Sequence, residues 1–226
     1  PDHLPEYVDR HIAVWSPAPR KQEKADLVKL FHTDLDKLKI FIINVEAFST
    51  AKGVKFTENF ILGHQVLFAV DESTTIKNPK ASRTKAITKL AKNTKYRRIL
   101  TGSPITQSPL DLYSQTEVLE TNLLGYTSYY SFQNHYGEVV NRYFGGRTVR
   151  QVVGYRNLDE LSQKLDSFSY RVLKSDCLDL PEKLYIRRDV TLTAEQKKLY
   201  AELKELAITE LANQETVSVT NVLTQL

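Results

Sequence analysis

A short apolar run that ends in two adjacent carboxylates constrains this chain more than any other feature. The run occupies 66–70 (Val-Leu-Phe-Ala-Val), and Asp71 and Glu72 follow it directly. Five apolar residues in a row predict a strand that is covered on both faces, as in a parallel sheet. The two acids then lie at the carboxyl end of that strand, which is the edge where open α/β sheets bind ligands.

The segments around this run alternate between strand and helix patterns. Apolar runs over 11–15, 40–45 and 98–100 predict further strands, and the charged segment 20–31 has the apolar periodicity of a helix. Buried strands that alternate with amphipathic helices indicate an α/β fold with a parallel sheet and right-handed crossovers. The 226 residues suffice for one large or two small domains, and 41% hydrophobic residues exclude a disordered chain.

The middle of the chain is rich in aromatic residues, which crowd the segment 126–144. Gly145-Gly146 predicts a tight turn between strands over 139–144 and 148–155. We expect the aromatic side chains to pack in the core of a helical insertion. Stacking on nucleic-acid bases is the alternative.

The last third of the chain predicts a helix, a connector and a longer helix. Asn157, with Glu160 three residues later, marks the start of the first helix. The segment 184–192 predicts a strand. Thr193 and Gln196 have the spacing of a capping box that opens the long helix.

Basic residues gather beside the acid pair. Between Ser73 and Leu110 there are nine lysines and arginines and no acid, although the net charge of the chain is only +4. Lys85, Lys89 and Lys92 share one face of a predicted helix. This stripe suits a phosphate-bearing partner, and a solvated helix face is the simpler interpretation.

Two adjacent carboxylates at a strand end repel each other, and a bound divalent cation would offset that cost. In nucleoside triphosphatases the first acid of such a pair holds Mg²⁺, often through water, and the second can act as general base toward the attacking water. Here these roles would fall on Asp71 and Glu72. Buried strands also end in acids merely to cap a loop, so the pair alone leaves both readings open.

A second string is predicted at the same edge of the sheet. Thr101, Gly102 and Ser103 form a small, hydroxyl-rich turn directly after the strand over 98–100. We expect Thr101 and Ser103 to hydrogen-bond the acid pair and to report the state of the nucleotide to a neighbouring surface. A turn of this composition is unremarkable when taken alone.

The order of these strings resembles a known family. Asp71-Glu-Ser-Thr is similar to motif II of the Swi/Snf-related ATPases, a branch of helicase superfamily two, with Thr74 in place of the usual histidine. Leu100-Thr-Gly-Ser-Pro-Ile-Thr-Gln resembles motif III, and Ile43-Asn-Val-Glu resembles the motif Ib region. Further matching strings begin at Asp111 and continue to the long helix, and the spacing is most similar to bacterial and phage members.

This resemblance implies a RecA-like parallel sheet flanked by helices, with a helical and hairpin insertion and a C-terminal strand–helix connector. The expected domains are the distal part of the first RecA-like lobe (1–120), the insertion with the end of that lobe (121–180), and the connector with the start of the second lobe (181–226). No glycine of the chain precedes a lysine, as the phosphate-binding motif I requires. We expect motif I upstream of Pro1 and most of the second lobe beyond Leu226, so the chain alone should be inactive.

The resemblance also implies that the intact protein couples hydrolysis of Mg-ATP to movement along double-stranded DNA. Asp71 would help to place Mg²⁺ through water, and Glu72 would activate the lytic water. Thr101, Gly102 and Ser103 would complete the nucleotide site and couple it to DNA movement. The predicted contacts to DNA are Asn44, Lys52, Lys55, Lys77 and Arg83.

Other functions and partners follow from the same resemblance. The alternatives are an RNA-directed helicase of the same superfamily and a degenerate lobe that serves as a DNA-binding or docking module. The second RecA-like lobe of the same polypeptide is an expected partner. The expected compartment is the cytoplasm of a bacterium or a phage-infected host, or the nucleus in a eukaryote. The longest apolar run, 66–70, is far below the ~20 residues that cross a bilayer, and Cys177 with five scattered histidines gives no zinc site.

Overall fold

The computed structural model describes residues 5, 7–32, 37–177 and 184–212. The chain divides into two compact units, Pro1–Tyr170 and Arg171–Leu226. The elements of the first unit, in chain order, are β1 (Arg10–Val14), α1 (Lys21–Lys29), β2 (Leu38–Ile42), the 3₁₀ helix η1 (Val45–Ser49), α2 (Ala51–Gly63), β3 (Leu67–Val70), η2 (Ser73–Ile76), α3 (Ser82–Ala91), β4 (Tyr96–Ile99), η3 (Pro109–Asp111), α4 (Leu112–Leu119), α5 (Tyr129–Tyr136), β5 (Gly137–Phe144), β6 (Arg147–Tyr155) and α6 (Leu158–Asp166).

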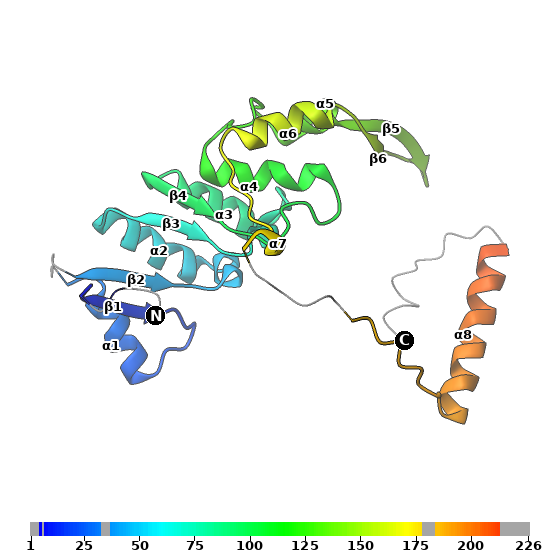
Figure 1. Cartoon of the computed structure of the whole chain (residues 1–226), viewed down its shortest axis with the longest axis horizontal. Helices are drawn as coiled ribbons and strands as arrows, with labels where there is room; N and C mark the ends of the chain where they lie inside the picture. The colour runs from blue at the N-terminus through cyan, green and yellow to red at the C-terminus, as the bar shows by residue number, and fades with distance from the viewer. Residues whose placement is uncertain (1–4, 6, 33–36, 178–183, 213–226) are drawn as a thin grey trace. The chain divides into compact units, whose positions relative to one another are not determined.

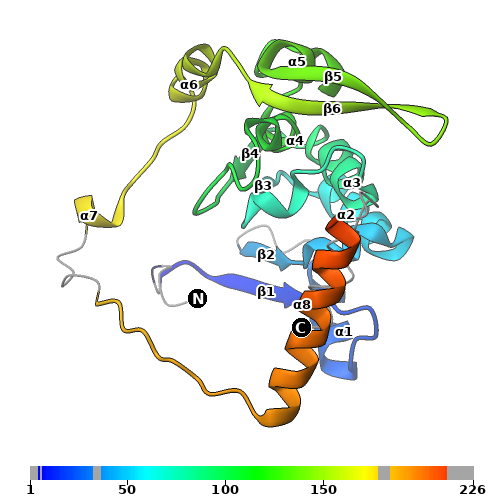
Figure 2. The same ribbon diagram turned by 90° about the vertical axis from the view of Figure 1, so that its right-hand side faces the viewer.

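Four parallel strands form the centre of the first unit. β1 pairs with β2, and β3 pairs with β4, both in parallel. Figures 1 and 2 show the two pairs side by side in the order β1, β2, β3, β4, and hydrogen bonds of the sheet run within each pair. The predicted α/β fold with parallel strands and intervening helices is therefore confirmed.

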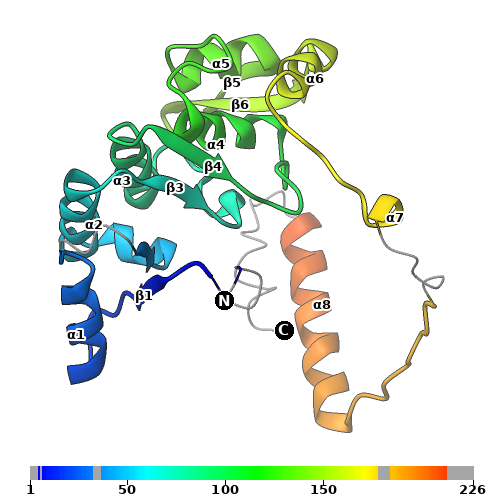
Figure 3. The ribbon, with the colours of Figure 1, turned by 60° about the vertical axis from the view of Figure 1, so that its left-hand side comes forward.

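The strands are covered on one face, which corrects the expectation that the run 66–70, the strand β3, is covered on both. In the β3–β4 register Leu67 pairs with Tyr96 and Ala69 with Arg98, and these four residues are exposed, Leu67 to 61%. The strand order explains this, because right-handed connections between strands that advance in one direction put their helices on the same side. Figure 3 shows α1, α2 and α3 on one side of the strands.

The core under this sheet is built from the apolar faces of the helices. Ile87, Leu90 and Ala91 of α3 are buried as predicted, and the lysine stripe of the same helix is exposed. One cluster lies between β3, α2, α3 and α4, and a smaller one joins β1, α1 and α2. Their buried members are Phe48, Ile61, Val70, Ile76, Ile87, Leu90, Ala91 and Val118, and Ala13, Leu27, Leu30 and Phe60.

The aromatic segment forms a core of its own. Phe132 and Tyr136 of α5 are fully buried, and Tyr126 and Tyr129 pack against the same cluster. This confirms the predicted core packing of the helical insertion. The predicted hairpin also forms, with β5 and β6 antiparallel on either side of the turn at 145–146, and it projects from α5 and α6 in Figures 1 and 2.

Glu160 of α6 ties this insertion together. Its carboxylate lies 2.9 Å from the Lys164 ammonium and 2.8 Å from a ring nitrogen of His135, and it accepts a 3.1 Å hydrogen bond from the Tyr136 hydroxyl. The bonds from Lys164 and then His135 lower the pKa of Glu160 to about 2. The predicted helix start at Asn157 is confirmed, since Asn157 is the N-cap of α6, with a φ of 56° and no side-chain cap hydrogen bond.

The described residues of the second unit form two helices, α7 (Lys174–Cys177) and α8 (Ala194–Ala212). The predicted capping box at the start of α8 is confirmed, because Thr193 and Gln196 each accept a hydrogen bond from the other's backbone amide, at 3.2 and 3.0 Å. The predicted strand over 184–192 is wrong, since this segment has no regular structure. A strand needs a neighbour to receive its backbone hydrogen bonds, and none of the described residues supplies one. Among the described helices, none is long and apolar enough to cross a membrane.

The aromatic core generates a first prediction. Phe132→Ala removes a fully buried ring, so we expect the free energy of unfolding to fall by about 3–5 kcal/mol. Tyr130→Ala, on the same helix but half exposed, should cost less than about 1 kcal/mol. Urea unfolding of both variants measures the difference. Equal losses would show that these rings are not a core.

Candidate functional site

The carboxyl ends of β3 and β4 are held together by backbone hydrogen bonds that continue past the strands. The Leu100 amide donates to the Val70 carbonyl at 2.9 Å, and the Ser73 amide donates to the Leu100 carbonyl at 3.0 Å. Asp71 and Glu72 lie between these two bonds, and both are exposed. The acid pair therefore stands at the open edge of the sheet, beside the segment that follows β4.

Glu72 has a left-handed backbone conformation, with φ 47° and ψ 56°. This region is uncommon for residues other than glycine, asparagine and aspartate, and it costs about 1–3 kcal/mol where surrounding structure imposes it. Here the surroundings do so. The Glu72 amide donates to its neighbour Asp71 at 2.9 Å, and the Thr75 amide donates to the Glu72 carbonyl at 3.0 Å.

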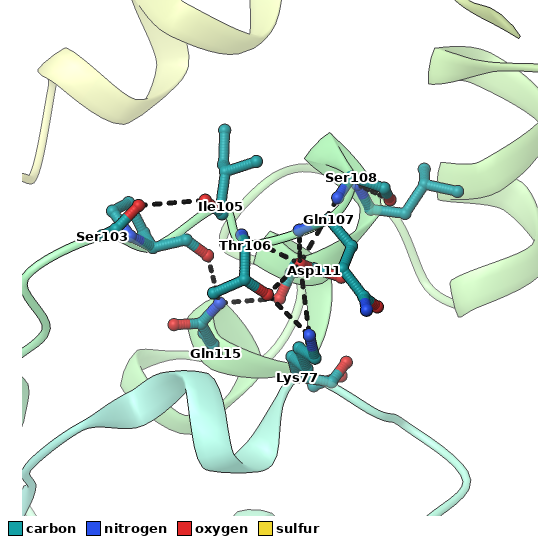
Figure 4. Close-up of polar contacts among 11 residues, drawn as sticks. Lys77, Ser103, Ile105, Thr106, Gln107, Ser108, Asp111 and Gln115 are labelled. Carbon is teal, nitrogen blue, oxygen red and sulfur yellow. Dashed lines mark hydrogen bonds and ion pairs between the residues drawn. The ribbon is translucent and has the colours of Figure 1, made fainter. Parts of the chain in front are cut away.

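Ser73, the next residue, is fully buried and connects the acid pair to α4. Its hydroxyl donates a 2.7 Å hydrogen bond to the side-chain oxygen of Gln115, which is also fully buried. The amide nitrogen of Gln115 donates to the carbonyl oxygens of Pro104 and Asp111, both at 2.8 Å. Figure 4 shows Gln115 beside the loop that contains Ser103 and Thr106.

Asp111 organises the rest of that loop. One of its oxygens accepts hydrogen bonds from the amides of Thr106, Gln107 and Ser108, and from the Thr106 hydroxyl at 2.9 Å. Lys77 donates to the Thr106 hydroxyl at 2.6 Å and lies 3.9 Å from the Asp111 carboxylate (Figure 4). Burial raises the pKa of Asp111, but the bonds from Gln107 and Thr106 outweigh it, so that the pKa is lowered.

The predicted hydrogen bonds from Thr101 and Ser103 to the acid pair are not formed. The Thr101 hydroxyl accepts from the Ser103 amide at 3.2 Å, and the Ser103 hydroxyl donates to the Ile105 carbonyl at 2.9 Å. The loop folds on itself because these short side chains reach its own backbone first. The link between loop and acid pair runs instead through the backbone and Gln115. A Cβ built on Gly102 would meet no atom within 4 Å, so this part of the edge is open.

The two carboxylates at the edge of the sheet suit a magnesium ion that is bound together with a nucleotide. Mg²⁺ in nucleotide sites keeps several waters and takes one or two protein carboxylates, with the phosphates supplying further oxygens. The exposed Asp71 carboxylate suits this role, and Glu72 beside it is open to solvent. No group of three or more acidic, histidine or cysteine side chains among the described residues would hold an ion without such a ligand.

The predicted DNA contacts lie in different settings. Asn44 is exposed where η1 begins. Lys52 and Lys55 lie in the first turns of α2 and not in a loop after the motif Ib region, since Thr50 caps the helix by accepting from the Gly53 amide. The Lys52 ammonium donates to the Pro17 carbonyl at 2.7 Å, whereas the Lys55 side chain forms no hydrogen bond or ion pair within the described part of the chain.

The two other predicted contacts are already engaged with protein groups. Lys77 is held by Thr106 and Asp111 at the loop, as described above. Arg83 lies 3.8 Å from the Glu46 carboxylate, and its Nε atom is buried with no hydrogen-bond partner in the described residues. Lys55 and Asn44 are exposed, and neither side chain forms a hydrogen bond or ion pair within the described residues.

The sequence alone predicts no role for two residues of this site. Asp111 and Gln115 belong to a string that resembles the family, but no chemistry follows from it. A local signal for Asp111 exists, because Ser108, Pro109 and Asp111 have the spacing of a helix start, and Ser108 and Asp111 do form a capping box. Gln115 gives no such signal, since a single glutamine on an amphipathic helix is usually exposed.

The fold and this edge define a class of protein, the parallel α/β domains that carry acids at their ligand-binding edge, as nucleoside triphosphatases do. The SNF2-related domain family matches residues 10–226. The chain belongs to this family, and the resemblance found in its motifs is confirmed.

Individual relatives cover part of the chain. The DNA annealing helicase and endonuclease ZRANB3 of Mus musculus is 33% identical over 138 residues, which are 60% of this chain and 13% of that protein. The TATA-binding protein-associated factor 172 of Homo sapiens is 32% identical over 150 residues, 65% of this chain and 8% of that protein. The chain thus spans a small fraction of the length of these relatives.

Similarity extends to solved structures. The SWI2/SNF2 ATPase core of Sulfolobus solfataricus in complex with dsDNA has 21% sequence identity and a TM-score of 0.43, over 96% of this chain and 46% of that one. The expected similarity to bacterial and phage members stays a prediction.

The Asp111 network generates a second prediction. Because the folded pKa of Asp111 lies below its ordinary value of 3.8, its carboxylate stabilises the fold above that value, and the contribution is lost as pH falls through the lower folded pKa. Asp111→Asn should lower the free energy of unfolding by about 1–3 kcal/mol at neutral pH. The difference from the unmodified protein should shrink below roughly pH 4.

Urea unfolding between about pH 7 and pH 3 measures this difference. Asp166→Asn, a change at an exposed carboxylate at the end of α6, is the matched control and should alter neither the stability nor its pH profile appreciably. A pH-independent loss in Asp111→Asn would contradict an ionic role for this side chain.

Proposed function

We propose that this chain is the distal part of the first RecA-like lobe of an ATP-dependent translocase that moves along double-stranded DNA. The observation that carries the proposal is the exposed acid pair at the end of β3, fixed beside the loop after β4, in a chain of the SNF2-related family. In this proposal residues 1–120 belong to the lobe proper, 121–180 to its insertion, and 181–226 to the connector toward a second lobe. That second lobe of the same polypeptide is the proposed partner in ATP hydrolysis.

The residues of the edge divide the chemistry between them. Asp71 would hold Mg²⁺ through water, and the bound ion would neutralise charge on the phosphates of ATP. Glu72 would orient the attacking water and accept its proton at the carboxylate. The loop 101–106 would respond to the nucleotide, because it is joined to the acid pair through the Ser73 backbone and the Gln115 side chain.

Contacts to DNA would come from the start of α2 and from η1. Lys55 is exposed on α2, and Asn44 is exposed where η1 begins. Backbone contacts of this kind bind nucleic acid without reading its sequence. DNA as the substrate is supported by the name of the relative from Mus musculus, a DNA annealing helicase. The compartment would then be the one that holds the DNA, the nucleus in a eukaryote or the cytoplasm of a bacterium.

A third prediction tests the catalytic assignment. In the intact protein, Glu72→Gln keeps the size of the side chain but removes the base, so ATP should still bind while turnover falls by about 10²–10⁴-fold. Nucleotide binding and steady-state ATP hydrolysis, with and without duplex DNA, measure the two effects. Glu120→Gln, an exposed change just after α4, is the control and should leave turnover unchanged.

Near-normal, DNA-stimulated turnover in Glu72→Gln would overturn the proposed function. Stimulation by single-stranded RNA but not by duplex DNA would identify an RNA-directed enzyme of the same superfamily. DNA binding without any ATP hydrolysis by the unmodified protein would identify a degenerate lobe that acts as a binding module.

A fourth prediction tests the DNA contact. Each lysine that neutralises a phosphate adds about 0.9 to the slope of the logarithm of the binding constant against the logarithm of salt concentration. Lys55→Ala should therefore reduce the slope by about that amount in the intact protein. Lys24→Ala, an exposed change on α1, should leave the slope as it is. Binding titrations at several salt concentrations decide, and equal slopes for all three proteins would remove Lys55 from the interface.

A further inference from the structure

Gln115 is a buried amide whose three hydrogen bonds reach three different segments. Its oxygen accepts from Ser73, which follows the acid pair, and its nitrogen donates to Pro104 in the loop and to Asp111 at the start of α4. The side chain is fully buried, so water does not share these bonds. Every polar atom of the amide is used, and the amide joins groups that are 42 and 11 residues away in sequence.

The bond to Ser73 acts on the conformation of Glu72. Ser73 is fixed at two points, its amide on the Leu100 carbonyl and its hydroxyl on Gln115. A residue with φ 47° relaxes toward the commoner regions unless its neighbours are held, because the left-handed region is the less favourable one. The Gln115 bond is the side-chain restraint that holds Ser73, and thereby the direction in which the Glu72 carboxylate leaves the backbone.

The bond to Pro104 connects the loop 101–106 to the same side chain that holds Ser73. Pro104 is exposed, and its carbonyl is the point where the middle of the loop is attached to α4 through Gln115. A shift of this loop would therefore pull on the amide that also restrains Ser73. A neighbour on the same helix shows the contrast. Thr116 is equally buried, but its hydroxyl bonds only to Leu112 and Tyr113 within its own helix.

We propose that Gln115 is a positioning residue that couples the loop 101–106 to Glu72, so that movement of the loop on DNA resets the direction of the general base. The inference rests on the proposed function, because it assigns Glu72 to proton abstraction. Gln115 itself touches neither nucleotide nor DNA in this proposal. It acts through Ser73 on one side and through Pro104 on the other.

The test uses the intact protein with three variants. Gln115→Met keeps the length of the side chain and removes all three bonds, Ser73→Ala removes only the bond to Ser73, and the third variant combines both changes. We expect Gln115→Met to lower DNA-stimulated kcat by about tenfold or more, since a small displacement of a catalytic group is expensive. KM for ATP should stay within about twofold of the unmodified value, because the residue does not contact the nucleotide.

The double variant separates coupling from general destabilisation. Because both single changes break the same bond, the double variant should lower kcat about as much as Gln115→Met alone. Thr116→Val is the matched control, with a buried polar group lost from the adjacent position of α4, and it should keep DNA-stimulated kcat within about twofold. Thermal unfolding of each variant records its stability. If Gln115→Met does not fold, Ser73→Ala, which loses a single hydroxyl, tests the inference alone. Its DNA-stimulated kcat should then fall, and an unchanged kcat would overturn the role of Gln115.

The outcomes distinguish this inference from the proposed function. A DNA-stimulated kcat within twofold of normal in Gln115→Met, additive losses of the two single changes in the double variant, or an equal loss in Thr116→Val would each overturn the role of Gln115. Each of these results is compatible with a Glu72→Gln variant that no longer turns over ATP. If Glu72→Gln remains active, the proposed function fails first and the coupling to Glu72 fails with it.

Discussion

The geometry of the candidate site depends on two backbone hydrogen bonds that lie beyond the end of the β3–β4 pair. Leu100 donates to Val70, and Ser73 donates to Leu100, so the chain leaves both strands in register. Parallel strands are normally free to diverge where their pairing stops. Here the two segments stay hydrogen-bonded until Ser73, which follows the two acids. The acid pair and the hydroxyl-rich loop are consequently held together, although Val70 and its register partner Ile99 are 29 positions apart in the sequence.

The candidate site is also continuous with the hydrophobic core. Helix α4 supplies Gln115, which bonds to Ser73 directly after the acid pair, and Val118, which joins the cluster under β3. A third contact comes from Ser114, whose hydroxyl donates to the Lys77 carbonyl. Packing of Val118 thus fixes how closely α4 approaches the sheet. The hydrogen bonds of Gln115 and Ser114 fix the position of the backbone that follows β3. A change in the core beneath α4 would reach the acids without any alteration in the acids themselves.

Much of the fold could be predicted because it depends on local patterns. The apolar run at 66–70 gave a strand, and Thr193 with Gln196 gave the start of a helix. The predictions that were wrong concern features that depend on residues far away in the sequence. The segment 184–192 has the composition of a strand but no neighbour among the described residues, and the covered face of the sheet follows from strand order, which no local pattern encodes. No local pattern marks Gln115 for the same reason, since its role depends on bonds to Ser73 and Pro104 in other segments.

Position 72 needs a residue that tolerates a left-handed backbone and, in the proposed function, a carboxylate. Glycine would adopt φ 47° without strain, so Glu72→Gly would relieve the backbone and remove the carboxylate together. Selection for stability and selection for activity therefore oppose each other at this position. The two hydrogen bonds of Ser73 hold the residue next to Glu72 in place and so help to keep this conformation. Divergence at this edge is thus expected to proceed through the partners of Glu72, which can be exchanged in concert, rather than through the acid itself.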